Sequence, residues 1–236
     1  MPYDHALDHG EAHGAATQTI RDLVIGVADG LTVPFALAAG VTGAVAASGL
    51  VLTAGLAEIV AGAISMGLGG YLAARSEAQH YDKEYAREIR ETKEIPGEER
   101  VEVAQILHRY GVREPVLSRV VTEITSDREQ WVEFMMRNEL GLERPDAQAA
   151  PKSAALVGGG YVLGGIFPLA PYAVVGNSHE ALWWSVAFTS VALIAFGAVR
   201  ARVLQTPVLT GALQSWLIGA VAAGAAYGLA RAVSPH

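Results

Sequence analysis

The sequence contains no cysteine, so disulfide bonds and thiolate metal sites are excluded. Basic residues are fewer than acidic ones, 17 against 24, and the net charge of −7 argues against nucleic acid as a partner and favours cations. We expect no cleavable signal, because no basic segment precedes a short apolar core in the polar stretch before the first apolar run. Charge is nearly absent from residues 20–75 and 153–233, whereas the segment between them carries most of the acids and bases.

Five apolar runs are long enough to cross a bilayer. A run of about 18 or more apolar residues indicates a transmembrane helix. We therefore predict an all-α membrane protein with five transmembrane helices, and we expect no nucleic acid partner. The expected spans are residues 23–46, 50–75, 153–175, 181–204 and 208–230.

The distribution of Lys and Arg predicts the orientation. Arg21 precedes the first span, many basic residues lie between the second and third spans, and Arg200 and Arg202 end the fourth. Because cytoplasmic loops carry an excess of Lys and Arg, the N-terminus and the central segment are expected in the cytoplasm. Arg231, on the opposite side, is a weak contrary signal.

Four segments follow from this pattern. They are a polar N-terminal tail (1–19), the first two transmembrane helices (20–76), a cytoplasmic helical segment (77–150) and the last three transmembrane helices (151–236). In the tail, His5, His9 and His13 would share one face of a helix and could bind a metal weakly. A disordered tail is the interpretation that we favour.

The second transmembrane helix is expected to continue beyond the membrane. No proline occurs from Ala57 to Glu94, and the good helix formers Ala, Glu, Arg and Leu are frequent there. We therefore predict one long helix that ends at Pro96. Two shorter helices are expected at about 98–110 and within 115–140, the second interrupted near a capping-box pattern of Ser126 and Glu129 and ended by Gly141.

Glycines in the membrane helices are spaced for close packing. Gly160 with Gly164, and Gly224 with Gly228, have the small-xxx-small spacing that lets helices approach in lipid. Both pairs support packing in general, and neither identifies a particular interface.

Asp29 is the only ionisable residue between positions 23 and 46. An acid at the centre of a membrane span costs roughly 2.5 to 3.5 kcal/mol, so such residues usually face a cavity or the interior of the protein and are functional. A surface acid on a buried helix of a soluble protein is the less favoured alternative. Since a low dielectric disfavours the charged form, Asp29 could bind a cation and a proton in turn. The pattern indicates a membrane protein that handles a cation.

A column of acids follows one face of the long second helix. At about 100° per residue, this face begins with Met66 inside the membrane and continues as carboxylates beyond it. Glu58 lies to one side of the face, within the apolar part. The alternative is a merely solvated helix, but neighbouring like charges destabilise such a helix, which favours a site. The column consists of Glu77, Glu84, Glu88 and Glu91.

The two shorter helices offer further ligands. Glu99 and Glu102 lie three residues apart in the first, and Met135 and Met136 lie about one turn before Glu139 in the second. A Met-Met pair beside aromatic residues is more often part of a hydrophobic core. Carboxylates with thioethers, and without thiolate, favour Fe²⁺, Co²⁺ or similar ions.

Three segments resemble the signature of the vacuolar iron transporter family. They are Asp-Gly-Leu-Thr-Val-Pro-Phe-Ala-Leu at 29–37, Ala-Ile-Ser-Met-Gly-Leu-Gly-Gly-Tyr-Leu-Ala at 63–73 and Gly-Gly-Ile-Phe-Pro-Leu-Ala-Pro-Tyr at 164–172. The resemblance implies a homodimer with a cytoplasmic three-helix metal-binding domain that extends from helix two. It also implies export of Fe²⁺, or of Mn²⁺ or another divalent metal, from the cytosol in exchange for protons. The metal is then a substrate, and no prosthetic group is expected.

The resemblance also assigns residues. It matches the family's intramembrane aspartate and methionine to Asp29 and Met66, and the glutamate of the second span to Glu58. Glu77 and Glu84 are possible additional ligands from the helix face alone. The residues matched to the family's metal-binding domain are Glu88, Glu91, Glu99, Glu102, Met135, Met136 and Glu139. The expected location is the plasma membrane in a bacterium and the vacuolar membrane in a eukaryote.

Two alternatives compete with a transporter. A ferritin-like di-iron oxidase would use Glu-x-x-His pairs, but Glu88 and Glu99 are followed at that spacing by Glu91 and Glu102, and His108 lies off it. A metal-sensing scaffold without transport would need no charge at membrane depth, so Asp29 argues against it. We therefore predict a transporter and not an enzyme.

Overall fold

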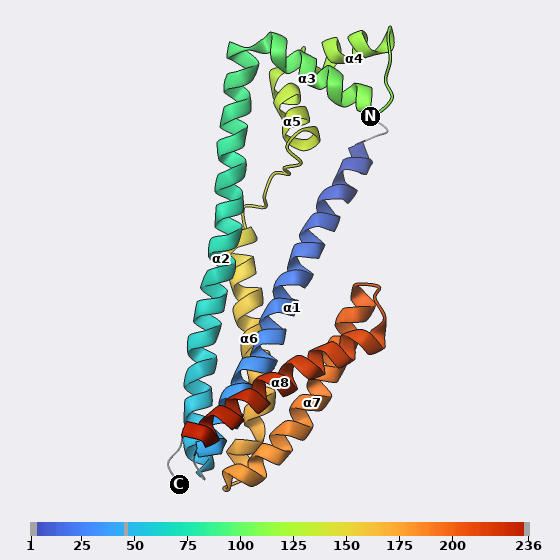
Figure 1. Cartoon of the computed structure of the whole chain (residues 1–236). Coiled ribbons are helices and arrows are strands. Elements are labelled where there is room, and N and C mark those ends of the chain that lie inside the picture. The colour runs from blue at the N-terminus through green and yellow to red at the C-terminus, as the bar shows by residue number, and fades with distance from the viewer. Residues whose placement is uncertain (1–3, 45–46, 234–236) are drawn as a thin grey trace. The chain divides into compact units, whose positions relative to one another are not determined.

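The computed structural model describes residues 4–44 and 47–233, with side chains from residue 18. In these ranges all regular secondary structure is helical, apart from one isolated bridge between Ala47 and Asn177, which confirms the all-α prediction (Figure 1). The helices are α1 (Asp4–Ala44), α2 (Ser48–Glu94), α3 (Pro96–Arg109), α4 (Val116–Ile124), α5 (Arg128–Asn138), α6 (Ala149–Val174), α7 (Ser178–Val203) and α8 (Val208–Val233).

The chain forms two compact units. We call Met1–Leu72 with Ala150–His236 the membrane unit, and Ala73–Ala149 the polar unit. The long helix α2 contributes to both, and it ends at Glu94, just before Pro96, as its sequence predicts.

Five helices among the described residues are long and apolar enough to cross a membrane. Their outer faces carry large apolar side chains, as lipid contact requires: on α2, Val60 and Ile64 are 61% and 67% exposed. The prediction of five spans is therefore confirmed. The spans are Gln18–Ala44, the apolar part of Ser48–Glu94, Ala149–Val174, Ser178–Val203 and Val208–Val233.

Helix α1 begins at Asp4, so the expectation of a disordered tail is wrong for the backbone from residue 4 onward. No proline occurs between Pro2 and Pro34, and helix-forming Ala is frequent in this stretch, so no proline ends the helix. The side chains of His5, His9 and His13 lie outside the described residues.

Glycines bring α1 and α6 into backbone contact. A Cβ atom on Gly30 would overlap the backbone of Tyr161, and one on Gly164 would lie 2.7 Å from the nitrogen of Leu31. Gly160 lies in the same contact, where its Cβ would be 3.1 Å from the nitrogen of Val27. The spacing of Gly160 and Gly164 therefore does mark a helix interface.

The second predicted glycine pair behaves differently. A Cβ atom on Gly224 or Gly228 would meet no described atom within 4 Å. The same spacing thus lies in a close helix contact in α6, whereas in α8 there is open space beside both glycines.

The polar unit has two small hydrophobic clusters. Val103 and Ile106 of α3 pack with Trp131 and Met135 of α5. A second cluster joins Tyr81 of α2 to the other face of α5. The predicted break between α4 and α5 is present, but its cap is Asp127, which accepts a hydrogen bond of 2.9 Å from the nitrogen of Gln130.

The capping box predicted at Ser126 and Glu129 is therefore wrong by one residue. The Ser126 hydroxyl donates to the carbonyl of Glu123 instead, and so ends α4 without starting α5. Gly141 follows α5 with a φ of 65°, a conformation that favours glycine.

Candidate functional site

Two glutamates of the polar unit are buried without adequate partners. Glu88 on α2 is 1% exposed and Glu99 on α3 is 3% exposed. The Oε2 atom of each is buried and has no hydrogen-bond partner among the described residues. Burying a carboxylate in this way is unfavourable unless a proton or a cation neutralises it.

Protonation is correspondingly favoured. Burial, reinforced by the charges of Glu139 and Glu91, raises the pKa of Glu88 to about 6, although Arg87 opposes the shift. Burial together with the charge of Glu102, and then of Glu88, Glu91 and Glu139, raises the pKa of Glu99 to about 7. These five carboxylates, Glu88, Glu91, Glu99, Glu102 and Glu139, thus repel one another, and we call them the acidic cluster.

The acidic cluster is not a closed coordination sphere. Among the described residues, no three acidic or histidine side chains converge closely enough to enclose a metal ion. Glu91 and Glu102 are partly exposed, and Glu139 is exposed at the C-terminal cap of α5. The arrangement therefore concentrates negative charge that can attract cations, and its side chains do not enclose an ion as they stand.

Arg87 balances part of this charge. Its guanidinium lies 2.7 Å from Glu84, 3.4 Å from Glu88 and 3.3 Å from Glu91. Burial lowers the pKa of Arg87, but these carboxylates outweigh it and raise the pKa overall. Arg87 was not among the predicted residues, although its spacing of three and four residues from Glu84 and Glu91 is that of helix ion pairs.

The remaining predicted ligands of the polar unit have other surroundings. Met135 and Met136 are 0% and 1% exposed, and each belongs to one of the two hydrophobic clusters. The structure thus shows both as core side chains. Glu84 is buried beside Arg87, whereas Glu77 is exposed on α2.

The membrane unit contains a second group of polar side chains. The hydroxyl of Tyr161 on α6 donates a short hydrogen bond to Oε1 of Glu58 on α2. The other oxygen of Glu58 is buried and finds no hydrogen-bond partner in the part of the chain that the structure describes. Asp29 on α1 is close enough to Tyr161 to interact with it electrostatically. Three membrane helices therefore contribute to one polar group.

Glycine makes room for the tyrosine in this group. A Cβ atom on Gly62 of α2 would lie 2.6 Å from the ring and hydroxyl of Tyr161. Gly30, directly after Asp29, packs against the backbone of Tyr161. Tyr161 was not among the predicted residues; the available signal was a polar aromatic side chain inside an uncharged run.

Met66 is partly exposed on α2, within the membrane unit. Because α2 is a single helix from Ser48 to Glu94, Met66, Glu84, Glu88 and Glu91 lie on one continuous helix, as predicted.

Membrane-spanning helices that hold half-buried carboxylates, Asp29 and Glu58, within their apolar stretches define a class, the multi-pass membrane proteins that handle ions. A sequence model of the VIT family matches residues 20–231. The chain is 50% identical to vacuolar iron transporter 2 of Oryza sativa subsp. japonica over 96% of its length and 92% of that relative. It is 48% identical to vacuolar iron transporter 1 of Arabidopsis thaliana, over 95% and 90% of the two chains.

A more distant relative is protein CCC1 of Saccharomyces cerevisiae, which is 36% identical over 89% of this chain and 67% of that protein. The chain belongs to the VIT family. The resemblance seen in the three sequence segments is thereby confirmed, and so is the prediction of a transporter and not an enzyme.

Proposed function

We propose that this protein transports Fe²⁺ out of the cytosol in exchange for protons. The observation that carries the proposal is the polar group of Asp29, Glu58 and Tyr161, which lies within the membrane-spanning helices of the membrane unit. Acids at this depth are unfavourable unless they serve an ion or proton path. We infer iron as the transported ion because the relatives are named vacuolar iron transporters.

The acidic cluster of the polar unit would collect the cation. Glu88 and Glu99 each hold a buried carboxyl oxygen that lacks a partner, and a divalent ion would satisfy both oxygens and relieve their repulsion. Arg87 would give up its ion pairs with Glu88 and Glu91 when the metal binds. The methionines Met135 and Met136 would have to leave the core to act as ligands, so the carboxylates are the first ligands in this proposal.

Exchange with protons would use the same intramembrane carboxylates. A carboxylate in a low dielectric needs a positive partner, and a metal ion and a proton can serve in turn. The hydrogen bond from Tyr161 gives Glu58 a fixed orientation toward the interior of the membrane unit. Asp29 would bind the ion deeper in the path and Met66 at its entrance.

The dimer and the location belong to the same proposal. Helix α2 exposes large apolar side chains, among them Leu56, Val60, Ile64 and Leu68, which suit contact with lipid or with a second copy. Two copies would form the path between them. Because the relatives at 48–50% identity are vacuolar iron transporters of plants, the vacuolar membrane is the proposed site, with a cytoplasmic N-terminus.

Flux through purified protein in vesicles tests the proposal. Vesicles with and without a pH gradient receive Fe²⁺, Mn²⁺, Co²⁺ or Zn²⁺ in turn, and metal uptake and internal pH are recorded together. We expect Fe²⁺ uptake that depends on the gradient and moves protons the opposite way. Metal uptake at the same rate with and without the pH gradient would exclude proton exchange. Metal binding without uptake would favour a metal-sensing scaffold over a transporter.

A further inference from the structure

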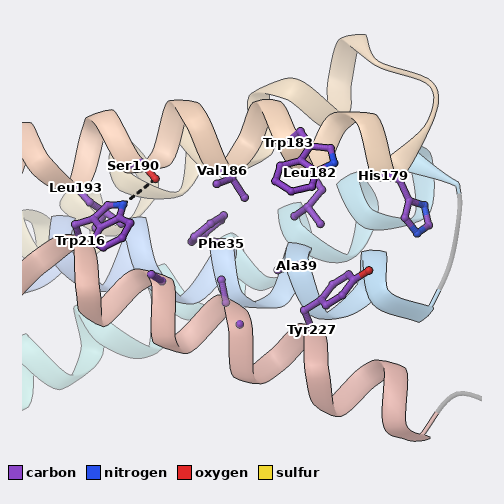
Figure 2. Close-up of a pocket in the computed structure, with 13 residues that line it drawn as sticks. Phe35, Ala39, His179, Leu182, Trp183, Val186, Ser190, Leu193, Trp216 and Tyr227 are labelled. Atoms are coloured by element: carbon purple, nitrogen blue, oxygen red, sulfur yellow. Dashed lines mark hydrogen bonds between the residues drawn. The ribbon is translucent and has the colours of Figure 1, made fainter.

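The membrane unit contains a cavity of about 360 Å³ between α1, α7 and α8 (Figure 2). Pockets for small molecules usually measure about 300 to 1,000 Å³, so the cavity is large enough for a ligand. It lies apart from the polar group at Asp29 and Glu58, because none of those residues lines it. Its walls include Phe35 of α1, Leu182 and Val186 of α7, and Trp216, Ala220 and Gly224 of α8.

The walls suit an apolar ligand. Aliphatic and aromatic side chains form the middle of the pocket, and no carboxylate or amine lines it. At one end the indole nitrogen of Trp216 already donates a hydrogen bond of 3.1 Å to the hydroxyl of Ser190 (Figure 2). At the other end lie His179 and Tyr227, the polar tips of the pocket. Such a lining does not attract an ion or a sugar.

The position of the pocket along the membrane-spanning helices indicates which molecules can enter it. His179 is the second residue of α7, and the pocket extends from there to Leu193, a rise of roughly 21 Å along the helix. One leaflet occupies about half of the ~30 Å hydrocarbon thickness, or ~15 Å. All three lining helices are candidate spans, so the pocket runs from the end of a span through at least one leaflet. At that depth the neighbouring molecules are lipid chains.

We propose that this pocket binds one acyl chain of a membrane phospholipid, with the headgroup at the His179 end. The chain would lie against Phe35 and Val186 and end near Trp216. Trp183, which is 75% exposed at the rim, would contact the lipid from outside, as tryptophan does near membrane interfaces. The inference needs only the membrane location of the helices and is independent of the metal that is transported.

Two glycines of α8 provide a matched pair for the test. Gly224 lines the pocket, whereas Gly228, one turn further on, does not. A Cβ atom at either position would meet no described atom within 4 Å. Gly224→Leu therefore places a side chain in the pocket without a backbone clash. Gly228→Leu is the control, because it changes helix propensity and surface apolarity in the same way but lies outside the pocket.

Native mass spectrometry of the full-length protein, extracted from bilayers with detergent, measures retained lipid. We expect the unaltered protein and Gly228→Leu to keep one phospholipid per chain under activation that strips surface lipid, and Gly224→Leu to lose most of it. Equal retention in both variants, or none in the unaltered protein, would overturn the proposal. So would a dimer that only Gly224→Leu dissociates, because the pocket would then be covered by a second copy.

A measurement on the unaltered protein covers the case in which Gly224→Leu does not fold. Phosphatidylcholine with a diazirine at the end of one acyl chain is incorporated into the vesicles and activated by light. We expect peptides that contain Val186 and Trp216 to be labelled more strongly than the exposed apolar face of α2 around Ile64. Equal labelling of both regions would mean that lipid covers the surface without entering the pocket.

Discussion

The buried carboxyl of Glu99 makes the stability of the polar unit depend on pH in a direction opposite to that of most acids. Burial and the neighbouring acids raise its pKa from the ordinary 4.5 to about 7. The raised pKa means that the folded state holds a proton more tightly than the unfolded chain. The contribution of protonated Glu99 to the stability of the polar unit is therefore complete below about pH 4.5, and it is lost as the pH rises through about 7.

The magnitude follows from the size of the rise. One pKa unit corresponds to about 1.4 kcal/mol, so ionised Glu99 makes the metal-free polar unit less stable by roughly 3 kcal/mol. Glu99→Gln keeps the shape of the side chain and removes its titration. We expect the variant to match the unaltered protein near pH 5 and to be more stable by about 2–3 kcal/mol near pH 8.

Hydrogen exchange of the full-length, metal-free protein in detergent is the assay. The backbone amides of α3 should exchange about 100-fold more slowly in Glu99→Gln than in the unaltered protein near pH 8, after correction for the intrinsic rate, and at equal rates near pH 5. Glu98→Gln, a change of the exposed neighbour, is the control and should have little effect at either pH. A Glu99→Gln variant that is destabilised equally at both pH values would show that ionisation of Glu99 does not destabilise the polar unit.

Three further outcomes are expected. Glu88→Gln with Glu91→Gln should lower the number of Fe²⁺ ions bound per full-length chain, measured by calorimetry, and an unchanged number would exclude both as ligands. Tyr161→Phe should lower the unfolding free energy by about 1–3 kcal/mol, because it leaves a buried carboxylate without its donor; an unchanged melting temperature would argue against that bond. Gly164→Leu should prevent folding, since its Cβ lies 2.7 Å from the α1 backbone, while Gly159→Leu, with no described atom within 4 Å, should express normally.

Local composition was sufficient to predict most of the helices. The spans are long and apolar with few charged residues, and α2 continues to Glu94 because no proline interrupts it. Local patterns were not sufficient to predict which surfaces meet. Gly160 with Gly164 and Gly224 with Gly228 have identical spacing, yet only the first pair lies in close backbone contact with another helix. The partner of that pair, α1, is more than a hundred residues away in the chain, so local spacing could not predict the contact.

The same distinction applies to the candidate site. Helical periodicity places Glu84, Glu88 and Glu91 on one face of α2, and the structure shows them around Arg87 on that helix. The hydrogen bond between Tyr161 and Glu58 joins residues 103 positions apart, so no local pattern could predict it.

The methionines show a limit of a different kind. Met135 and Met136 have the spacing expected for ligands and also the spacing of a core face, and sequence periodicity does not distinguish these roles. In the structure each packs into a different hydrophobic cluster.

Transport by an Asp29→Asn variant would show whether the intramembrane carboxylate carries the ion. The full-length variant is reconstituted in vesicles, and Fe²⁺ flux under a pH gradient is compared with the number of Fe²⁺ ions that the same preparation binds. We expect flux to fall to the level of protein-free vesicles while the bound ions remain, because the acidic cluster belongs to a separate unit. Flux at the rate of the unaltered protein would mean that Asp29 takes no part in the ion path.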